Sequence, residues 1–321
     1  MICLGLESTA HTFGVGICDE KRILANARDV YRPEKGGIHP MEAANHHNDT
    51  KEKVLEDALI EANLKIDDIN IFAYSAGPGL PPCLRVGSEF VTKIAGKKPI
   101  IEVNHCIAHI EIGKFATKVN DPIVIYVSGG NTQIIGYAAN RYRVFGETQD
   151  ISVGNVIDSV IRDSVGGFPG GPIFDELAKK GSYVELPYVV KGMDVSFTGI
   201  LTAAKKKYSE GVKIEDICYS LQETCYAMLV EVTERALAHA GKSEVLVVGG
   251  VAASQRLKEM LDIMCSERGA HFFAVPIEYA RDNAAMISFT GLLAYKSGQK
   301  PTEKPDFNPR WRTDEAEILW I

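Results

Sequence analysis

The chain has 321 residues, of which 45% are hydrophobic and 24% charged, and its net charge is −7. At roughly 150 residues per domain this length predicts two domains, and no run of roughly 18 apolar residues is present that would form a membrane-spanning helix. An acidic balance argues against nonspecific nucleic-acid binding, which depends on neutralising phosphates with Lys and Arg. The 7 cysteines are scattered and never spaced as Cys-x-x-Cys, which argues against a disulfide framework or a cysteine zinc knuckle. The N-terminus has no basic leader, so we expect a cytoplasmic protein.

The chain opens with three short apolar runs separated by small polar turns, a pattern typical of successive antiparallel strands. The expected strands are Ile2–Glu7, Phe13–Ile17 and Arg22–Ala27. The same pattern returns later, with strands expected at Ile123–Val127, Gln133–Ala138 and Tyr142–Phe145. This internal repeat predicts two related units.

Each strand triple is followed by helical patterns and further apolar strands. After the first triple we expect a helix near Met41–Ala62, a strand at Ile69–Tyr74, a turn at Ser75–Gly79, a helix near Arg85–Ala95 and a strand at Pro99–Val103. After the second we expect helices near 152–164, 172–180, 196–208 and 214–240, a strand at Glu244–Val248 and a helix near Gln255–Arg268. Alternating strands and helices predict an α/β fold with mixed sheets flanked by helices and a cleft between two domains. We expect the domains at residues 1–121, joined by the tail 298–321, and at residues 122–297.

Three glycine-rich turns lie in the second repeat, at Ser128–Thr132, Gly166–Pro172 and Gly249–Gly250. Such turns leave backbone N–H groups free to bind an anion, and together they favour a nucleotide site, although ordinary tight-turn chemistry is the better explanation of each alone. No Gly-x-x-x-x-Gly-Lys-Ser/Thr motif is present, which excludes a P-loop NTPase. Duplicated strand triples with phosphate-binding turns resemble the superfamily of actin, sugar kinases and Hsp70 ATPases, with duplicated ribonuclease H-like domains. This likeness concerns the fold and does not specify a reaction.

His105 and His109 are four residues apart directly after an expected strand. On a helix this spacing puts both rings on one face, where they can bind a metal, although two ordinary helix-face histidines fit as well. A zinc protease would need Glu after the first histidine, and Cys106 stands there. A further ligand must come from elsewhere: Asp282 opens the last expected helix, where a simple capping role is the alternative. A second cluster, His39 with His46 and His47, is interpreted as surface or substrate contacts.

Several segments spread along the chain match one family closely. They are Leu4–Gly16, Gly36–Pro40 with Ala43–His47, Gly77–Gly79, Val103–His109, Tyr126–Thr132, Gly167–Pro172, Lys191–Asp194, Gly249–Ala253 and the tail Pro309–Glu315. In these segments the chain resembles the universal tRNA N6-adenosine threonylcarbamoyltransferases, which include the catalytic subunit of the KEOPS complex and were once labelled O-sialoglycoprotein endopeptidases. The likeness covers essentially the whole chain.

The resemblance implies one metal ion, described in the family as iron, with zinc or magnesium as alternatives, held by His105, His109 and Asp282 with Tyr126 nearby. It also implies a site for threonylcarbamoyl-AMP, or for ATP or AMP. The matching positions are Tyr126, Val127, Ser128, Gly129, Gly130, Asp158, Gly171, Asp175 and Ser254. Asp158 and Asp175, each near an expected helix start, suit ribose hydroxyls as acceptors, with helix capping or solvent exposure as the alternative.

The chain departs from the family pattern at three places. Ser254 stands where the family has Asn, Ser159 where it has Lys, and Ala280–Ala285 reads Ala-Arg-Asp-Asn-Ala-Ala instead of Cys-Thr-Asp-Asn-Gly-Ala. These departures bear on affinity and turnover more than on the fold. The three residues expected to bind the metal are intact.

The implied reaction is attack by the N6 amine of adenosine 37, in tRNAs that read codons beginning with A, on the carbamoyl carbon of threonylcarbamoyl-AMP, with AMP leaving. Glu7 is the candidate general base, and solvation of a strand end is its alternative role. Two other functions remain open: a nucleotide-dependent phosphotransferase or ATPase, suggested by the repeat, and an inactive assembly subunit, suggested by Ser159, Ser254 and Ala284.

The family also implies partners: a small atypical kinase or ATPase, fused to this domain in some members, a small dimerising subunit and a subunit that binds the tRNA tail. The basic groups Lys205–Lys207 and Arg310–Arg312 could contact RNA, although a solvated face is the favoured interpretation of each. A tRNA substrate is compatible with a net charge of −7 if the partners supply most phosphate contacts. The isolated chain is then expected to bind tRNA weakly and with a shallow salt dependence.

Overall fold

A computed structural model describes residues 1–321 except 34–36 and 168. Gly36 and Phe168, which belong to two of the motifs named above, therefore lie outside the described residues. The chain divides into two compact units: the first comprises Met1–Phe115, Ala139–Tyr142 and Asp282–Ile321, and the second comprises Ala116–Ala138 and Arg143–Arg281. The last helix therefore groups with the first unit, whereas the sequence had placed residues up to 297 in the second domain.

The first unit is built on a five-stranded mixed sheet with the order β3-β2-β1-β4-β5. Its strands are β1 (Cys3–Glu7), β2 (Thr12–Cys18), β3 (Ile23–Val30), β4 (Ile71–Gly77) and β5 (Ile100–Asn104). β1 pairs antiparallel with β2 and parallel with β4. Every residue of β1, β2 and β4 is buried, as expected for strands covered on both faces.

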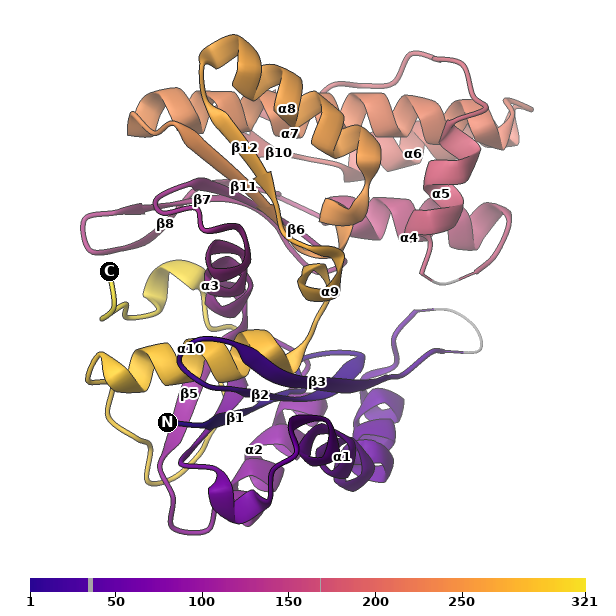
Figure 1. The fold of residues 1–321 in the computed structure, drawn as a ribbon. Coiled ribbons are helices and arrows are strands. Elements are labelled where there is room, and N and C mark those ends of the chain that lie inside the picture. The colour runs from indigo at the N-terminus through magenta and orange to yellow at the C-terminus, as the bar shows by residue number, and fades with distance from the viewer. Residues whose placement is uncertain (34–36, 168) are drawn as a thin grey trace. The chain divides into compact units, whose positions relative to one another are not determined.

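Helices cover the two faces of this sheet: α1 (Pro40–Ala62), α2 (Pro81–Ala95) and α10 (Ala284–Lys296). The helix α3 (His105–Thr117) follows β5, and short 3-10 helices lie at η1 (Ile66–Asp68) and η3 (Thr313–Glu315). Figure 1 shows α1 and α2 on one face and α10 on the other. Leu4 and Leu6 of β1 pack in the core on the α1 side, together with Val54.

Glycines allow α10 to lie unusually close to the sheet. A Cβ atom on Gly5 would come within 2.2 Å of the Ser288 nitrogen, and one on Gly16 within 2.3 Å of the Ala284 carbonyl carbon. The sequence alternates these glycines with large apolar residues, so one face of β1 and β2 contributes the core and the other admits a helix backbone. This close packing fixes the N-terminal end of α10, where Asp282 lies.

The second unit repeats the same architecture. Its sheet has the order β12-β11-β6-β7-β8, formed by β6 (Ile123–Val127), β7 (Thr132–Ala138), β8 (Arg141–Glu147), β11 (Glu244–Val248) and β12 (His271–Ala274). β6 pairs antiparallel with β7 and parallel with β11. In both units the first strand of a triple therefore pairs with the second strand on one side and with a parallel strand on the other, which confirms the predicted repeat and the α/β fold class.

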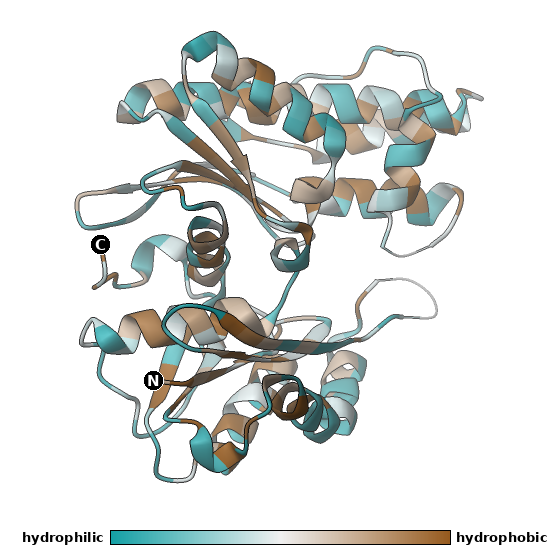
Figure 2. Cartoon of the chain, in the orientation of Figure 1, coloured by the Kyte–Doolittle hydropathy of each residue, from teal (hydrophilic) through white to brown (hydrophobic). Residues whose placement is uncertain are grey.

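The helices of the second unit are α4 (Val153–Ser164), α5 (Gly171–Ala178), α6 (Thr198–Ser209), α7 (Ile214–Ala240), α8 (Gln255–Arg268) and α9 (Ile277–Ala280). A 3-10 helix, η2 (Gly250–Ala253), and a two-stranded ribbon of β9 (Val190–Lys191) and β10 (Asp194–Val195) complete it. Figure 2 shows the strands at the centre of the sheets in brown and long stretches of the helices in teal. No helix among the described residues is both long and apolar enough to cross a membrane.

Most predicted elements are confirmed to within a few residues. Some boundaries differ by three or four residues: α2 begins at Pro81 instead of Arg85, and β3 ends at Val30 instead of Ala27. The predicted strand at Ile69–Tyr74 begins at Ile71 and runs to Gly77, into the residues predicted as a turn. Ser75 and Gly77 both pair with β5, so the ladder extends to Gly77, three residues past Tyr74, with a register shift between Ser75 and Gly77.

Candidate functional site

The two histidines of the His-x-x-x-His motif lie at the start of α3, which follows β5 without an intervening loop. Asn104 makes this possible: its Oδ1 accepts hydrogen bonds from the N–H groups of Cys106 (2.9 Å) and Ile107 (3.2 Å), which satisfies free donors of the first turn. The side chains of His105 and His109 are both buried, with 5% and 1% exposed. The strand end and the cap therefore fix the helix that presents both imidazoles.

Asp282 lies beside these imidazoles, and it does not cap α10. The neighbouring Asn283 is the cap, because its side chain accepts the N–H of Met286 at 3.1 Å. The Oδ1 atom of Asp282 is 3.4 Å from Nε2 of His109 and 3.6 Å from Nε2 of His105. The alternative capping role for Asp282 is therefore wrong.

The three side chains have the donor set and spacing of a metal site. Their ligand atoms all lie within 4.8 Å of one another. For metal–ligand distances of about 2.1 Å, neighbouring ligands of a tetrahedral ion are about 3.4 Å apart, close to both separations from Asp282. Two imidazoles and one carboxylate fit a transition metal, and three protein ligands leave a coordination position open.

Glu7, at the end of β1, supports the first histidine. Its side chain is fully buried, its Oε2 lies 2.9 Å from Nδ1 of His105, and its Oε1 accepts the N–H of Thr9 at 2.7 Å. The hydroxyl of Thr9 also donates to Oε1. Solvation of a strand end, the alternative role for Glu7, is therefore wrong. A carboxylate on Nδ1 directs Nε2 of the ring toward the metal position.

The charges of this cluster balance around His105. Burial lowers the pKa of His105, but the carboxylates of Glu7 and Asp282 outweigh it and raise the pKa to about 9. Burial lowers the pKa of His109 below its ordinary value. For Asp282, burial favours the neutral acid, but the hydrogen bond from His109 and the charge of His105 hold its pKa well below the usual range. The carboxylates that stabilise a proton on His105 would equally stabilise a metal cation bound to Nε2 in place of that proton.

In the second unit, the turn between β6 and β7 is open and built from backbone. The Ser128 hydroxyl accepts the N–H of Asn131 at 3.0 Å and that of Gly130 at 3.3 Å. Gly129 and Gly130 are exposed, and a Cβ on either would meet no atom within 4 Å. This surface is accessible to a phosphate.

Two other glycines pack directly against the backbone of this turn. A Cβ on Gly154 would lie 2.4 Å from the Ser128 carbonyl oxygen, and one on Gly249, whose φ is +93°, would lie 2.3 Å from the Val127 carbonyl oxygen. The tight turn itself therefore requires a glycine at position 249. Tyr126, in β6 of this unit, has a buried ring whose Cδ2 would lie 3.2 Å from that same Cβ.

The two predicted ribose acceptors lie in the middle of helices, not near their starts. Asp158 of α4 accepts the N–H of Gly170 at 2.8 Å, immediately before the open Gly171 at the start of α5. Asp175 of α5 accepts the Gln222 amide at 3.0 Å and the Ser254 hydroxyl at 3.3 Å through the same oxygen, Oδ1. Burial raises the pKa of Asp175.

Sequence reasoning missed Gln222, although a signal was present. It is a polar residue on the buried stripe of α7, between Leu221 and Cys225. A buried amide needs a partner, so its position in a core stripe indicated a polar contact.

The structure also corrects the interpretation of His47 as a surface or substrate contact. Its side chain is fully buried, and its Nε2 lies 3.1 Å from the Ala10 carbonyl oxygen. His39 is exposed, as predicted.

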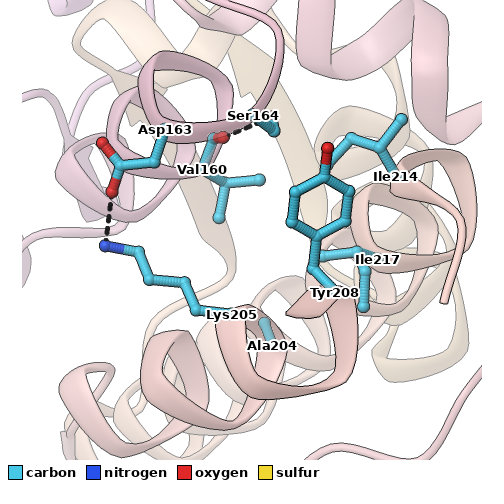
Figure 3. A pocket seen from close by; sticks show the side chains of 8 residues that line it. All are labelled: Val160, Asp163, Ser164, Ala204, Lys205, Tyr208, Ile214 and Ile217. Atoms are coloured by element: carbon cyan, nitrogen blue, oxygen red, sulfur yellow. Dashed lines mark hydrogen bonds and ion pairs between the residues drawn. The ribbon is translucent and has the colours of Figure 1, made fainter. Parts of the chain in front are cut away.

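A cavity of about 240 Å³ lies in the second unit among α4, α6 and α7. Lys205 and Asp163 form an ion pair of 2.6 Å at its edge, and Tyr208 lies opposite them (Figure 3). None of the predicted site residues lines this cavity. Lys205 is thus paired with a carboxylate within the protein.

Solved structures of other proteins share this fold. The full-length HypF protein aligns with 92% of this chain and 46% of its own length, with a TM-score of 0.63 and 13% identity. The ROK hexokinase from Thermus thermophilus aligns with 93% of this chain and all of its own, with a TM-score of 0.52 and 15% identity. These likenesses show the fold alone: the chain has the duplicated, actin-like architecture.

Sequence comparison gives the family. The profile of the tRNA N6-adenosine threonylcarbamoyltransferases matches residues 22–289. Proteins of that name from Thermococcus kodakarensis and Archaeoglobus fulgidus are 54% and 50% identical to this chain, each over the full length of both proteins. A "Probable bifunctional tRNA threonylcarbamoyladenosine biosynthesis protein" from Methanocaldococcus jannaschii is 51% identical over all of this chain, which spans 61% of that protein. The chain belongs to the tRNA N6-adenosine threonylcarbamoyltransferase family.

Proposed function

We propose that this chain transfers the threonylcarbamoyl group from threonylcarbamoyl-AMP to N6 of adenosine 37 in tRNAs that read codons beginning with A. The observation that carries the proposal is the convergence of His105, His109 and Asp282 in a chain of this family. The N6 amine attacks the carbamoyl carbon, the bond to the adenylate phosphate breaks, and AMP leaves. No protein nucleophile is needed.

The metal of this site is held by His105, His109 and Asp282, and Tyr126 is proposed as a neighbour. When bound, it supplies a Lewis acid that polarises the carbamoyl carbonyl or holds the threonyl carboxylate. Two imidazole nitrogens favour iron or zinc over magnesium, which prefers oxygen ligands. We propose iron as the metal.

The adenylate is proposed to bind at the glycine turns of the second unit, from Tyr126 to Gly130 and at Gly171. The open backbone of Gly129 and Gly130 suits a phosphate, whose charge the turn amides stabilise as AMP departs. The Asp158 carboxylate, bonded to the Gly170 N–H, orders the turn before Gly171. Asp175 has its Oδ1 bound by Gln222 and Ser254, and we propose that Oδ2 accepts a ribose hydroxyl.

We assign Glu7 to positioning and not to general-base catalysis. Both of its oxygens already accept hydrogen bonds within the protein, from His105 and Thr9. A carboxylate bound in this way orients the imidazole of a metal ligand. Its oxygens accept hydrogen bonds from within the protein and do not accept a proton from the substrate. The N6 proton must therefore pass to another acceptor.

We propose that the chain works in the cytoplasm as the catalytic subunit of a KEOPS complex. Its partners are a small atypical kinase or ATPase, a small dimerising subunit and a subunit that binds the tRNA tail. The bifunctional name of the longer Methanocaldococcus relative supports a second activity associated with this domain. The net charge of −7 supports partners that supply phosphate contacts to the tRNA.

The test is a transfer assay with the partner subunits, labelled threonylcarbamoyl-AMP and unmodified tRNA. We expect label in the tRNA with the unaltered chain and transfer about 10³-fold slower with His109→Ala. Transfer that survives His109→Ala unchanged, or a complete assembly without transfer, would contradict the proposal. Retained nucleotide binding with no turnover in that assembly would instead support an inactive assembly subunit.

Metal content separates this function from the nucleotide-dependent phosphotransferase or ATPase suggested by the repeat. A phosphotransferase holds Mg²⁺ only together with its nucleotide, whereas two imidazoles and a carboxylate retain a transition metal in its absence. Elemental analysis of the purified, nucleotide-free chain distinguishes the two.

A further inference from the structure

The turn between β1 and β2, residues 8–11, touches two of the proposed metal ligands. The hydroxyl of Thr9 lies 3.3 Å from Nδ1 of His105, and Nδ1 of His11 lies 4.0 Å from Oδ2 of Asp282. A shift of this turn would therefore move groups in contact with both His105 and Asp282. What holds the turn in place thus matters for the metal centre.

Three successive carbonyl groups of the turn are held by three different elements. The N–H of Leu80, just before α2, donates to the Thr9 carbonyl at 2.7 Å, and the N–H of Tyr31, after β3, donates to the His11 carbonyl at 2.8 Å. The carbonyl between them, that of Ala10, accepts from Nε2 of His47 at 3.1 Å. The first two hydrogen bonds come from backbone N–H groups. Of the three, a side-chain substitution can therefore remove only the hydrogen bond from His47.

Hydrogen-bond chemistry fixes the state of His47. A carbonyl oxygen only accepts, so Nε2 of His47 must carry the hydrogen, and a neutral ring then has its lone pair on Nδ1. Burial, and next the charge of His46, lower the pKa of His47 to about 4, which keeps the ring neutral near pH 7.

His46 and Asp29 support this arrangement from the exposed side. Nδ1 of His46 is 3.5 Å from Nδ1 of His47, and Nε2 of His46 is 2.9 Å from Oδ1 of Asp29. A carboxylate only accepts, so Nε2 of His46 donates to Asp29. The chain of contacts runs from the partly exposed Asp29 through His46 and His47 to the Ala10 carbonyl.

We infer that His47 is a positioning residue of the metal centre. Its Nε2–H holds the Ala10 carbonyl, and the turn thereby keeps Thr9 and His11 beside His105 and Asp282. This inference rests on the proposed metal site, and it gives the His46–His47 pair a role that the proposed reaction alone does not.

The test compares two amides that differ in reach. In His47→Gln the amide nitrogen takes the place of Nε2 and can still reach the Ala10 carbonyl, whereas in His47→Asn it ends near the position of Nδ1 and cannot. Both variants bury one amide at the same position, so their effects on folding are similar. His39→Asn, at an exposed histidine of the same segment, is the control.

Each full-length variant is loaded with Co²⁺ alone, and its visible absorption spectrum and the rate of Co²⁺ loss to a chelator are measured together with the melting temperature. We expect His47→Asn to lose Co²⁺ about 10 to 100 times faster than the unaltered chain, with a changed spectrum, as for other losses of support behind metal ligands. The rate of Co²⁺ loss from His47→Gln and from His39→Asn should stay within about threefold of that of the unaltered chain. His47→Gln keeps a hydrogen bond to the Ala10 carbonyl, and His39→Asn leaves the original one in place.

Two outcomes overturn the inference. If His47→Asn lowers only the melting temperature, with the spectrum and release rate unchanged, His47 is structural and does not position the metal centre. If His47→Gln loses Co²⁺ as fast as His47→Asn, the contact with Ala10 is not the cause. Failure of the unaltered chain to bind Co²⁺ would overturn the metal centre itself, and this inference with it.

Discussion

The two units place different chemistry at the same point of the same topology. In each, the first strand of the triple ends in a turn that leads into an antiparallel second strand. In the first unit that turn, residues 8–11, is held through three successive carbonyls and follows the buried Glu7. In the second, the turn at 128–131 exposes two glycines with no neighbour where a side chain would be.

This difference fits the sign of the charge that each site is proposed to bind. A cation needs side-chain donors in fixed orientation, and buried donors require further hydrogen bonds behind them, as Glu7 provides for His105. An anion is bound by backbone N–H groups, which need no support from side chains but must remain open to the ligand. The first unit therefore depends on its buried network and the second on the shape of its turns.

The largest effect is expected from removing a metal ligand. His109→Ala should abolish stable metal binding and lower the rate of tRNA threonylcarbamoylation about 10³-fold, which corresponds to the several kcal/mol that a Lewis acid supplies. AMP binding by the second unit should remain within about twofold, because His109 belongs to the first unit, the residues proposed to bind AMP belong to the second, and substitutions that share no partners act independently. Metal analysis, the transfer assay and calorimetry measure the three.

His271→Ala, at an exposed histidine of the second unit, is the matched control and should change none of these. A loss of AMP affinity in His109→Ala as large as the loss of metal would show that the two sites are not separable.

The sequence allowed this comparison to be anticipated only in part. The strand triples were visible because short apolar runs between polar turns have few other structural solutions. The pair His105 and His109 was visible from its spacing, whereas Asp282, which lies 173 residues from His109, required the resemblance to a family. Distant ligands leave no local pattern.

The supporting residues were harder to predict for the same physical reason. Glu7 and His47 are polar side chains in segments whose local pattern suggests exposure, and both are fully buried because partners 98 and 37 residues away satisfy them. Local propensity reports on neighbours in sequence, and hydrogen bonds of this kind form only in the folded chain.

A second test concerns the network behind the metal. Glu7→Gln keeps an acceptor for His105 but removes the negative charge, so we expect metal affinity to fall about 10- to 100-fold. The turnover of the fully metal-loaded variant should change less than about threefold, because Glu7 touches no reacting atom in the proposed reaction. Metal titration and turnover under saturating metal measure the two effects separately.

A general-base role for Glu7 predicts the opposite result: metal affinity would stay unchanged and turnover would fall. A general base contributes about 10²- to 10⁴-fold to the rate. If Glu7→Gln bound metal normally and lost turnover by such a factor, the positioning role assigned to Glu7 would be wrong.

A third test measures how the free energy of unfolding depends on pH, because His47 is buried in its neutral form. Unfolding returns the pKa of His47 from about 4 to its ordinary value of 6.5, so the unfolded chain binds the proton more tightly. The stability from the neutral ring is therefore complete above pH 6.5 and is lost as the pH falls toward 4. Between pH 7 and pH 5 the free energy of unfolding should fall by about 2 kcal/mol from this ring alone.

His47→Gln, which cannot titrate, should lack this part of the pH dependence. Urea unfolding of both proteins at pH 7 and pH 5 gives the change in the free energy of unfolding for each. The other titrating groups contribute equally to both changes, so the difference between the two proteins reports on His47. Equal slopes for the two proteins would mean that His47 gains a proton in the folded state as easily as in the unfolded one.

The smallest effect is expected from disturbing the open turn. Gly154→Ala places a Cβ 2.4 Å from the Ser128 carbonyl oxygen and 2.8 Å from the Gly129 nitrogen. Both contacts are with backbone, so the turn itself must move, at a cost of about 1–3 kcal/mol. If the turn binds the phosphate, AMP affinity should fall about tenfold while Co²⁺ binding by the first unit stays unchanged.

Gly199→Ala is the matched control, because Gly199 lies in α6 of the same unit and a Cβ there meets no atom within 4 Å. It removes the same glycine flexibility without pressing on the turn, so AMP affinity should stay within about twofold, and stability should rise by up to about 1 kcal/mol. Equal AMP affinity in the Gly154 and Gly199 variants would mean that the nucleotide does not depend on the Ser128–Asn131 turn. The backbone anion site of the second unit would then have to be sought at the Gly170–Gly171 turn, which the Asp158 carboxylate orders from a different side.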